Sequence, residues 1–147
     1  VFGLDVIAGK KKITGFFHDY SRTVNPDHAM IHAFGDEVGK LEWRKERALP
    51  EWAQAIFSPH MVAAGNVSKR EELDQLLELS LDSVDAYLTD IGNFNHMADT
   101  DEVKAAQNRY AHYQKQNPHT PKTMTSLGLD EEDVRVFVQE CLFPDIE

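Results

Sequence analysis

The sequence predicts an α+β fold, or a three-layer sandwich built on an antiparallel sheet. Strand-like segments open the 147-residue chain, and amphipathic helices make up most of the remainder. A doubly wound fold would instead alternate strands with helices along the chain. The first two strands are also separated by only a few residues, a length that suits a hairpin.

The first two strands are predicted over residues 1–8 and 13–20, joined by Gly9 and three lysines. A third strand is predicted over residues 60–64, because this short apolar stretch ends at a Gly-Asn pair. Alternation gives the first strand two faces, one with Phe2, Leu4 and Val6 and the other with Gly3, Asp5 and Ile7.

Helices are predicted over residues 26–39, 50–57, 69–91, 100–116 and 130–142. The first helix is expected to have Asn25 as its cap and Pro26 in its first position, where a missing N–H costs nothing. Ser68 and Glu71 form a capping box at the start of the third helix. Residues 117–122 are predicted to be a polar loop.

Composition excludes several classes of function. Lys and Arg number 15 against 25 Asp and Glu, so the formal net charge is −10. Nucleic acid and anionic membrane surfaces both need a basic face, so neither is an expected partner. The longest apolar run is four residues, too short to span a bilayer. With the single cysteine Cys141, no internal disulfide can form, and a cytoplasmic location is expected.

The start of the chain indicates a longer protein. No Met stands at position 1, and the chain opens in a strand-like apolar segment. A strand buried on one face needs neighbours at its edges. Residues 1–147 are therefore expected to be the C-terminal portion of a single domain, with the N-terminal part of its sheet missing.

Known cofactor motifs are not found in the sequence. No Gly-rich phosphate loop or dinucleotide fingerprint occurs, so neither a nucleotide nor a flavin is expected. His28 and His32 have the spacing of metal ligands on one helical face, with Asp36 one turn further. Zinc needs three or four convergent ligands, so two surface histidines are the favoured interpretation and no metal is expected.

Asp5 is unusual because aspartate is depleted in strands, yet it stands among Leu4, Val6 and Ile7. If its face were buried, the loss of solvation would favour the protonated carboxyl and make it a proton donor near neutral pH. If its face were exposed, Asp5 would simply face water. The pattern favours neither interpretation.

Three other polar segments each allow a functional and a structural interpretation. The loop at residues 117–122 offers donors for a carboxylate or a carbonyl, although a capping loop is the commoner structure. The basic run Lys10, Lys11 and Lys12 is either a solvated turn or a docking patch for an acidic partner. Arg47 is suited to a substrate carboxylate, or to a surface ion pair.

An ordered set of segments resembles the ferredoxin-dependent bilin reductases, in particular the phycocyanobilin:ferredoxin oxidoreductase branch and its phage-type relatives. The segments match in order and in approximate spacing along nearly the whole chain: residues 2–9, 47–52, 56–58, 110–120 and 141–143. The resemblance implies an α/β/α sandwich with a central antiparallel sheet, and biliverdin between the sheet and the C-terminal helices.

The implied activity is reduction of biliverdin IXα to a phycobilin, either phycocyanobilin or phycoerythrobilin. Reduced ferredoxin would supply electrons one at a time, side chains would supply protons, and no cofactor or metal would be bound. Residues 1–147 would be the C-terminal portion of a bilin reductase domain, in the cytoplasm or in that of a phage-infected host.

The resemblance also implies site residues. Asp5 matches the strand aspartate that donates a proton, and Asn117 lies where the family has a polar residue near the bilin. Arg47 matches an arginine that binds a propionate, and Thr14 a small hydroxyl residue on the neighbouring strand. His119 stands where relatives often carry a lysine, so propionate binding there is expected to differ.

Two departures leave the reduced double bond open. The family's catalytic histidine lies on the strand before that of Asp5, which would precede Val1. The segment over residues 59–65 is shorter than in some relatives. The alternative to a reductase is a protein of the same fold that binds a tetrapyrrole without reducing it. A third possibility is an acidic helical interaction module whose likeness to the family is accidental. Because ferredoxins are acidic, docking is expected at the lysine run with Arg44 and Lys45.

Overall fold

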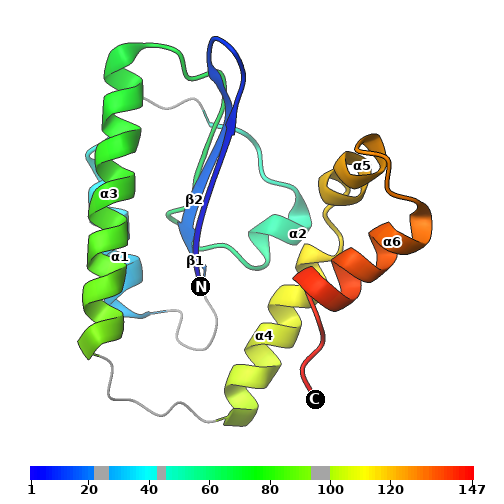
Figure 1. Ribbon diagram of the computed structural model, residues 1–147. Helices are drawn as coiled ribbons and strands as arrows, with labels where there is room; N and C mark the ends of the chain where they lie inside the picture. Colours follow the sequence, from blue (N-terminus) through cyan, green and yellow to red (C-terminus); the bar gives the residue numbers. More distant parts are fainter. Residues whose placement is uncertain (22–26, 43–45, 94–99) are drawn as a thin grey trace. The chain divides into compact units, whose positions relative to one another are not determined.

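The computed structural model describes residues 1–21, 27–42, 46–93 and 100–147, which fall into two compact units (Figure 1). The first unit comprises Val1–Leu49 and Phe57–His96, and the second comprises Pro50–Ile56 and Met97–Glu147. The three strands found among these residues all belong to the first unit and form an antiparallel sheet in the order β1-β2-β3. The predicted α+β class with an antiparallel sheet is therefore confirmed.

The sheet is built on the predicted hairpin. Strand β1 (Phe2–Ala8) pairs with β2 (Ile13–Tyr20), and the register shifts between Ile7 and Ala8. Strand β3 (Val62–Ala64) pairs with the other side of β2 and is shorter than the predicted residues 60–64. Beyond β3, Glu46 forms an isolated bridge with Ala64, so β1 is the edge strand on the opposite side.

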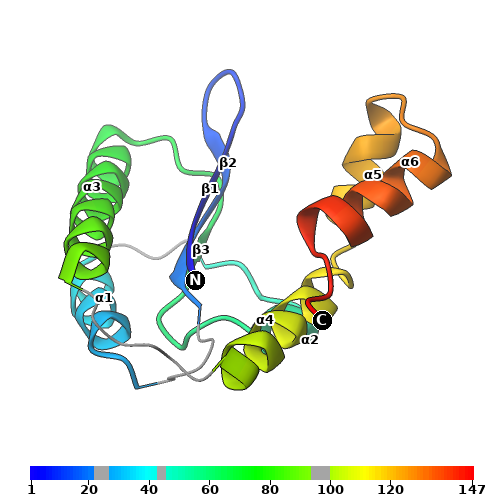
Figure 2. The same cartoon turned by 60° about the horizontal axis from the view of Figure 1, so that its bottom comes forward.

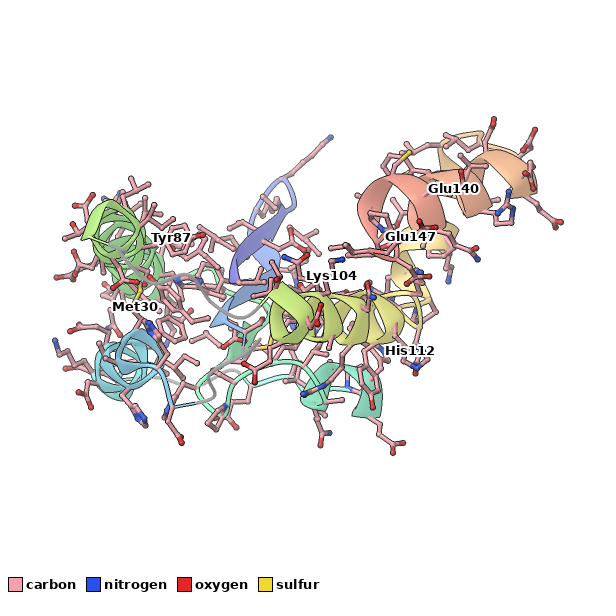
Figure 3. The ribbon with its side chains drawn as sticks, turned by 90° about the horizontal axis from the view of Figure 1, so that it is seen from below. Met30, Tyr87, Lys104, His112, Glu140 and Glu147 are labelled. Carbon is pink, nitrogen blue, oxygen red and sulfur yellow. The ribbon has the colours of Figure 1, made fainter. Side chains whose placement is uncertain are left out.

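Helices α1 (Ala29–Gly39) and α3 (Arg70–Asn93) lie side by side against one face of the sheet (Figures 1 and 2). Apolar residues at helical spacing on both helices pack with alternate residues of the strands. Met30 of α1 and Tyr87 of α3 lie on the inner sides of their helices (Figure 3). The buried core is formed by Phe16, Tyr20, Ile31, Phe34, Val38, Val62, Ala64, Val67, Leu76 and Leu79.

The start of α1 differs from the prediction. The helix begins at Ala29, and the ring Nδ1 of His28 caps it by accepting the Met30 N–H at 3.2 Å. Asn25 and Pro26, the predicted cap and first residue, lie outside the described residues. The prediction that His28 and His32 share a helical face is wrong, because His28 precedes the helix. Within the described ranges, no three His, Cys, Asp or Glu side chains converge as a metal site would require.

The second unit consists of helices: α2 (Glu51–Gln54), α4 (Thr100–Gln114), α5 (His119–Ser126), α6 (Glu131–Val136) and the π-helical segment η1 (Phe137–Leu142). Arg109 of α4 donates to the carbonyl of Ala55, just after α2, at 2.7 Å. The Asn108 amide forms two hydrogen bonds with the backbone of Ile146, which attach the C-terminal segment to α4. In the described part of the chain, no helix is both long and apolar enough to cross a membrane.

The loop prediction for residues 117–122 is wrong, because α5 begins at His119. The Asn117 side-chain oxygen accepts the His119 N–H at 2.9 Å, which satisfies a donor that the helix start would otherwise leave unpaired. Pro121 lies in the first turn, where its missing N–H has no helical partner to lose. Proline therefore marked a helix start here rather than a loop.

His18 of β2 gives the first unit a dependence of stability on pH. It has no exposed surface, and its Nδ1 lies 2.8 Å from the Gly3 carbonyl oxygen, so the neutral ring donates there. Its Nε2 has no hydrogen-bond partner among the described residues, and the rings of Phe2 and Phe34 lie 5.2 and 4.8 Å away. Burial therefore lowers the pKa of His18 below its usual 6.5.

Stability is expected to fall on acidification, because below about pH 6.5 the unfolded chain binds a proton that folded His18 resists. The loss grows as the pH falls toward the lowered folded pKa, and reaches at most about 1.4 kcal/mol per pH unit. Urea unfolding at pH 7.5 and 5.5 measures it. The variant His18→Asn keeps a donor for Gly3 but does not titrate, so an equal pH dependence in this variant would assign the effect to other groups.

Candidate functional site

Asp5 lies on the face of the sheet that points away from α1 and α3. Residues directly opposite in an antiparallel pair share a face. Asp5 pairs with Phe17, which in turn pairs with Ala63, whereas the core residue Phe16 pairs with Val6 and Ala64. We call this second face the Asp5 face, formed by Asp5, Ile7, Gly15, Phe17, Asp19 and Ala63.

Of the two interpretations of Asp5, the structure shows the exposed one. Its neighbours Val6 and Ile7 are 47% and 49% exposed, although they point to opposite faces. The described residues of the first unit therefore leave apolar side chains of the edge strand β1 uncovered on both faces. Exposed apolar side chains on an open strand edge are characteristic of a surface that takes a ligand or another segment.

Asp19, at the far end of the same face, has a structural role. Its buried carboxylate accepts hydrogen bonds from the Ser21 hydroxyl at 3.0 Å, from the Ser58 N–H at 2.9 Å and from the Ser58 hydroxyl. These donors compensate for the burial of the charge and attach the segment after α2 to β2. No local pattern predicts this network, because Ser58 is 39 residues from Asp19.

Arg47 reaches the Asp5 face from the other edge of the sheet. Its backbone N–H donates to the Ala63 carbonyl at 2.9 Å, which places it beside β3. Its guanidinium carbon lies 5.5 Å from the centre of the Phe17 ring, the geometry of a cation–π contact. Among the described residues no carboxylate forms an ion pair with Arg47, so the surface ion pair considered from the sequence is not formed there.

Phe17 is the member of this group that sequence reasoning missed. It is half-buried and lies directly opposite Asp5, beneath the Arg47 guanidinium. The pair Phe16-Phe17 was the available signal, because adjacent aromatic residues in a strand must point to opposite faces. The Asp5 face therefore offers a carboxyl, a guanidinium and an aromatic ring.

Thr14 lies where the register of the hairpin shifts. Ile13 pairs with Ala8 and Gly15 with Ile7, so Thr14 has no paired residue in β1. Its exposed side chain donates to the Ile7 carbonyl at 3.0 Å, which uses the hydroxyl hydrogen within the hairpin. The Thr14 oxygen can still accept a hydrogen bond from a ligand.

Asn117 and His119 lie together in the second unit, at the start of α5. Asn117 is half-buried, and its side-chain oxygen accepts the N–H of His119, the first residue of α5. Its amide nitrogen remains a donor. His119 is exposed. The structure thus groups Asp5, Thr14 and Arg47 in the first unit, and Asn117 with His119 in the second.

The lysine run forms the tip of the β1–β2 hairpin (Figure 1). Lys10, Lys11 and Lys12 are exposed, and Lys12 donates to the Asn66 side chain at 2.6 Å. Arg44 and Lys45, the other residues of the predicted docking patch, lie outside the described residues.

Comparisons with known proteins agree on the family. No curated protein matches the chain. The solved structure of PcyX, one of 14 matching solved chains, is 29% identical with a TM-score of 0.59, and the match covers 99% of this chain and 58% of PcyX. The chain thus spans less than two thirds of the length of that relative. Residues 1–144 match the family described as ferredoxin-dependent bilin reductase, and the chain therefore belongs to this family.

Proposed function

We propose that the protein reduces biliverdin IXα to a phycobilin, with reduced ferredoxin as the electron donor and no bound cofactor. Family membership supports the reaction class. The observation that carries the assignment to this chain is that Asp5, Phe17 and the Arg47 guanidinium share one face of the sheet. A bilin is a flat apolar chromophore with two carboxylates, and such a ligand needs an apolar surface with few polar groups, at least one of them basic.

Asp5 is the proposed proton donor. Either phycobilin contains four more hydrogens than biliverdin, so the reaction consumes four electrons and four protons, and each electron that ferredoxin delivers must be matched by one proton. A carboxyl beside the chromophore supplies that proton to the bilin radical, and its exposure lets it take up another from water. Which positions of the bilin receive the four hydrogens follows from its pose and distinguishes phycocyanobilin from phycoerythrobilin as product.

Arg47 is the proposed partner of a propionate. A guanidinium can donate two parallel hydrogen bonds to one carboxylate, which fixes orientation as well as adding affinity. For Thr14, Asn117 and His119 we propose contacts with the substrate, and for Asn117 a part in catalysis, on the family resemblance. After their internal hydrogen bonds are made, the Thr14 oxygen can still accept a hydrogen bond from the substrate, and the Asn117 amide nitrogen can still donate one.

Residues 1–147 are proposed to act as the C-terminal portion of one reductase domain. The uncovered apolar residues of the edge strand β1 and the 58% coverage of PcyX support this proposal. A further strand beside β1 would pair its open edge.

One observation favours a second candidate, a tetrapyrrole-binding protein without catalysis. The histidine that the family places beside the aspartate has no counterpart on the Asp5 face among the described residues, since His18 lies on the core face. Adding biliverdin and following its absorbance tests for binding by either candidate. Adding reduced ferredoxin anaerobically then separates them, because only a reductase yields the spectrum of a phycobilin.

Lys11→Glu is expected to raise the apparent KM for ferredoxin and to leave biliverdin affinity unchanged, because it places a negative charge at the hairpin tip facing an acidic partner. The effect should shrink as ionic strength rises. Steady-state kinetics at low and high salt measure it. Lys104→Glu, on exposed α4, changes the net charge equally and is the matched control (Figure 3). An unchanged KM for Lys11→Glu at low salt would remove the tip from the docking patch.

A further inference from the structure

The Arg47 side chain lies against two glycines. A Cβ built on Gly65 would stand 3.1 Å from Arg47 Cδ and 3.3 Å from the Thr14 carbonyl oxygen. A Cβ on Gly15 would stand 3.3 Å from Arg47 Nη1 and 2.9 Å from the Phe17 ring. These approaches are closer than ordinary van der Waals contact, so a Cβ at Gly65 would require the Arg47 side chain to shift by a few tenths of an ångström, and a Cβ at Gly15 would require the Phe17 ring to move.

The backbone does not require glycine at these two positions. Among the described residues the glycine with positive φ is Gly128, in the second unit, so Gly15 and Gly65 have backbone conformations open to other residues. Both are buried in or beside strands, where glycine weakens the sheet relative to a residue with a side chain. The structure shows one physical reason for glycine at these positions, which is that the Arg47 side chain lies tightly against the place where a Cβ would stand.

The contacts restrict an otherwise flexible side chain. Arginine loses rotamer entropy when it is immobilised, and a side chain already held in its binding geometry avoids that cost when the ligand arrives. Phe17 supports the guanidinium from below, Gly65 admits the aliphatic part, and Gly15 leaves room for Nη1. Among the described residues no carboxylate of the chain neutralises this restrained cation.

We propose that Gly15, Gly65 and Phe17 form a seat for Arg47 and act as positioning residues that select a substrate carrying a carboxylate. The inference rests on the proposed function, since it deepens the substrate assignment of the same face. It adds that recognition of the carboxylate depends on two residues without side chains, which leave room for Arg47 over Phe17, the residue paired with Asp5.

Biliverdin and biliverdin dimethyl ester are the probes, because they differ only in the two carboxylates. Titration followed by absorbance gives Kd for each. Wild type is expected to bind the free acid about tenfold more tightly, the size of one charge-assisted contact. Gly65→Ala should lose most of this preference by weakening free-acid binding and leaving ester binding unchanged. Gly39→Ala is the matched control, because a Cβ there meets nothing within 4 Å.

A double-mutant cycle with Arg47→Ala shows whether Gly65 acts through the arginine. In the Arg47→Ala background, Gly65→Ala should have no further effect on free-acid Kd. An equal loss in both backgrounds, or a loss of ester binding too, would overturn the seat and indicate a general disturbance of the sheet. Thermal melting checks folding, and Gly15→Ala replaces Gly65→Ala if the latter fails to fold.

The outcomes separate this inference from the proposed function. If wild type binds both probes equally, or Gly65→Ala keeps the full preference, the seat is wrong while bilin binding and reduction stand. If wild type binds neither probe, the proposed function fails, and the inference with it. If Gly65→Ala removes the preference for the free acid when Arg47 is present, and has no further effect in the Arg47→Ala background, the inference and the proposed function are both supported.

Discussion

Asp5→Asn is expected to stop product formation and leave bilin binding nearly unchanged. Asparagine has the same shape as aspartate but has no carboxyl proton to transfer, and loss of a general acid slows a reaction by about 10²- to 10⁴-fold. Electron transfer does not need this proton, so the first electron should still reach the bilin. The variant should therefore accumulate a radical or half-reduced species.

Anaerobic absorbance and electron paramagnetic resonance spectra, recorded after addition of reduced ferredoxin, detect that species. The control is Asp85→Asn, which makes the same substitution at an exposed position of α3 on the other side of the sheet and should turn over like wild type. Turnover by Asp5→Asn at the wild-type rate would exclude Asp5 as the proton donor, whatever its effect on affinity.

Asp19→Ala is expected to destabilise the first unit by about 3 kcal/mol or more, because buried donors lose the carboxylate that they share. The Ser58 N–H, the Ser58 hydroxyl and the Ser21 hydroxyl all donate to it. The backbone donor of Ser58 cannot turn away to water, so its loss is the hardest to compensate. We also expect the segment after α2 to become more open to proteolysis.

Urea unfolding and limited proteolysis measure the two effects. Asp19→Asn is the graded control, since the amide oxygen keeps one acceptor and the expected loss is about 1 to 2 kcal/mol. Equal stability of Asp19→Ala and wild type would show that solvent replaces the carboxylate and that the network contributes little.

Local patterns in the sequence were sufficient to predict most elements. The alternation of Phe2, Leu4 and Val6 with Asp5 and Ile7 predicted β1 and its two faces, and the register with β2 confirms both. The apolar stripe predicted α3 to within a few residues. The predicted capping box is one residue too early, because α3 begins at Arg70 and the Glu72 carboxylate, not that of Glu71, accepts the backbone N–H before the helix, from Lys69 at 3.5 Å. These signals are local because a strand or helix repeats its side-chain directions every few residues.

The predicted helix starts were wrong where a side chain forms a hydrogen bond with a backbone N–H at the start of the helix. His28 caps α1, and Asn117, one residue before the N-cap of α5, accepts the first N–H of that helix; neither role follows from periodicity. Both involve one hydrogen bond to a residue two positions along, which an isolated pattern of apolar residues does not report.

By itself the sequence determined the order of the strands and of the helices other than α5, the acidic character, and a family likeness carried by short ordered segments. Only the tertiary structure decided which face of the sheet is the core and that Arg47 lies over Phe17 between two glycines. It also decided that Asp19 is satisfied by Ser58. These contacts join residues about 20 to 50 positions apart, and a chain specifies such partners only through the packing of the whole sheet.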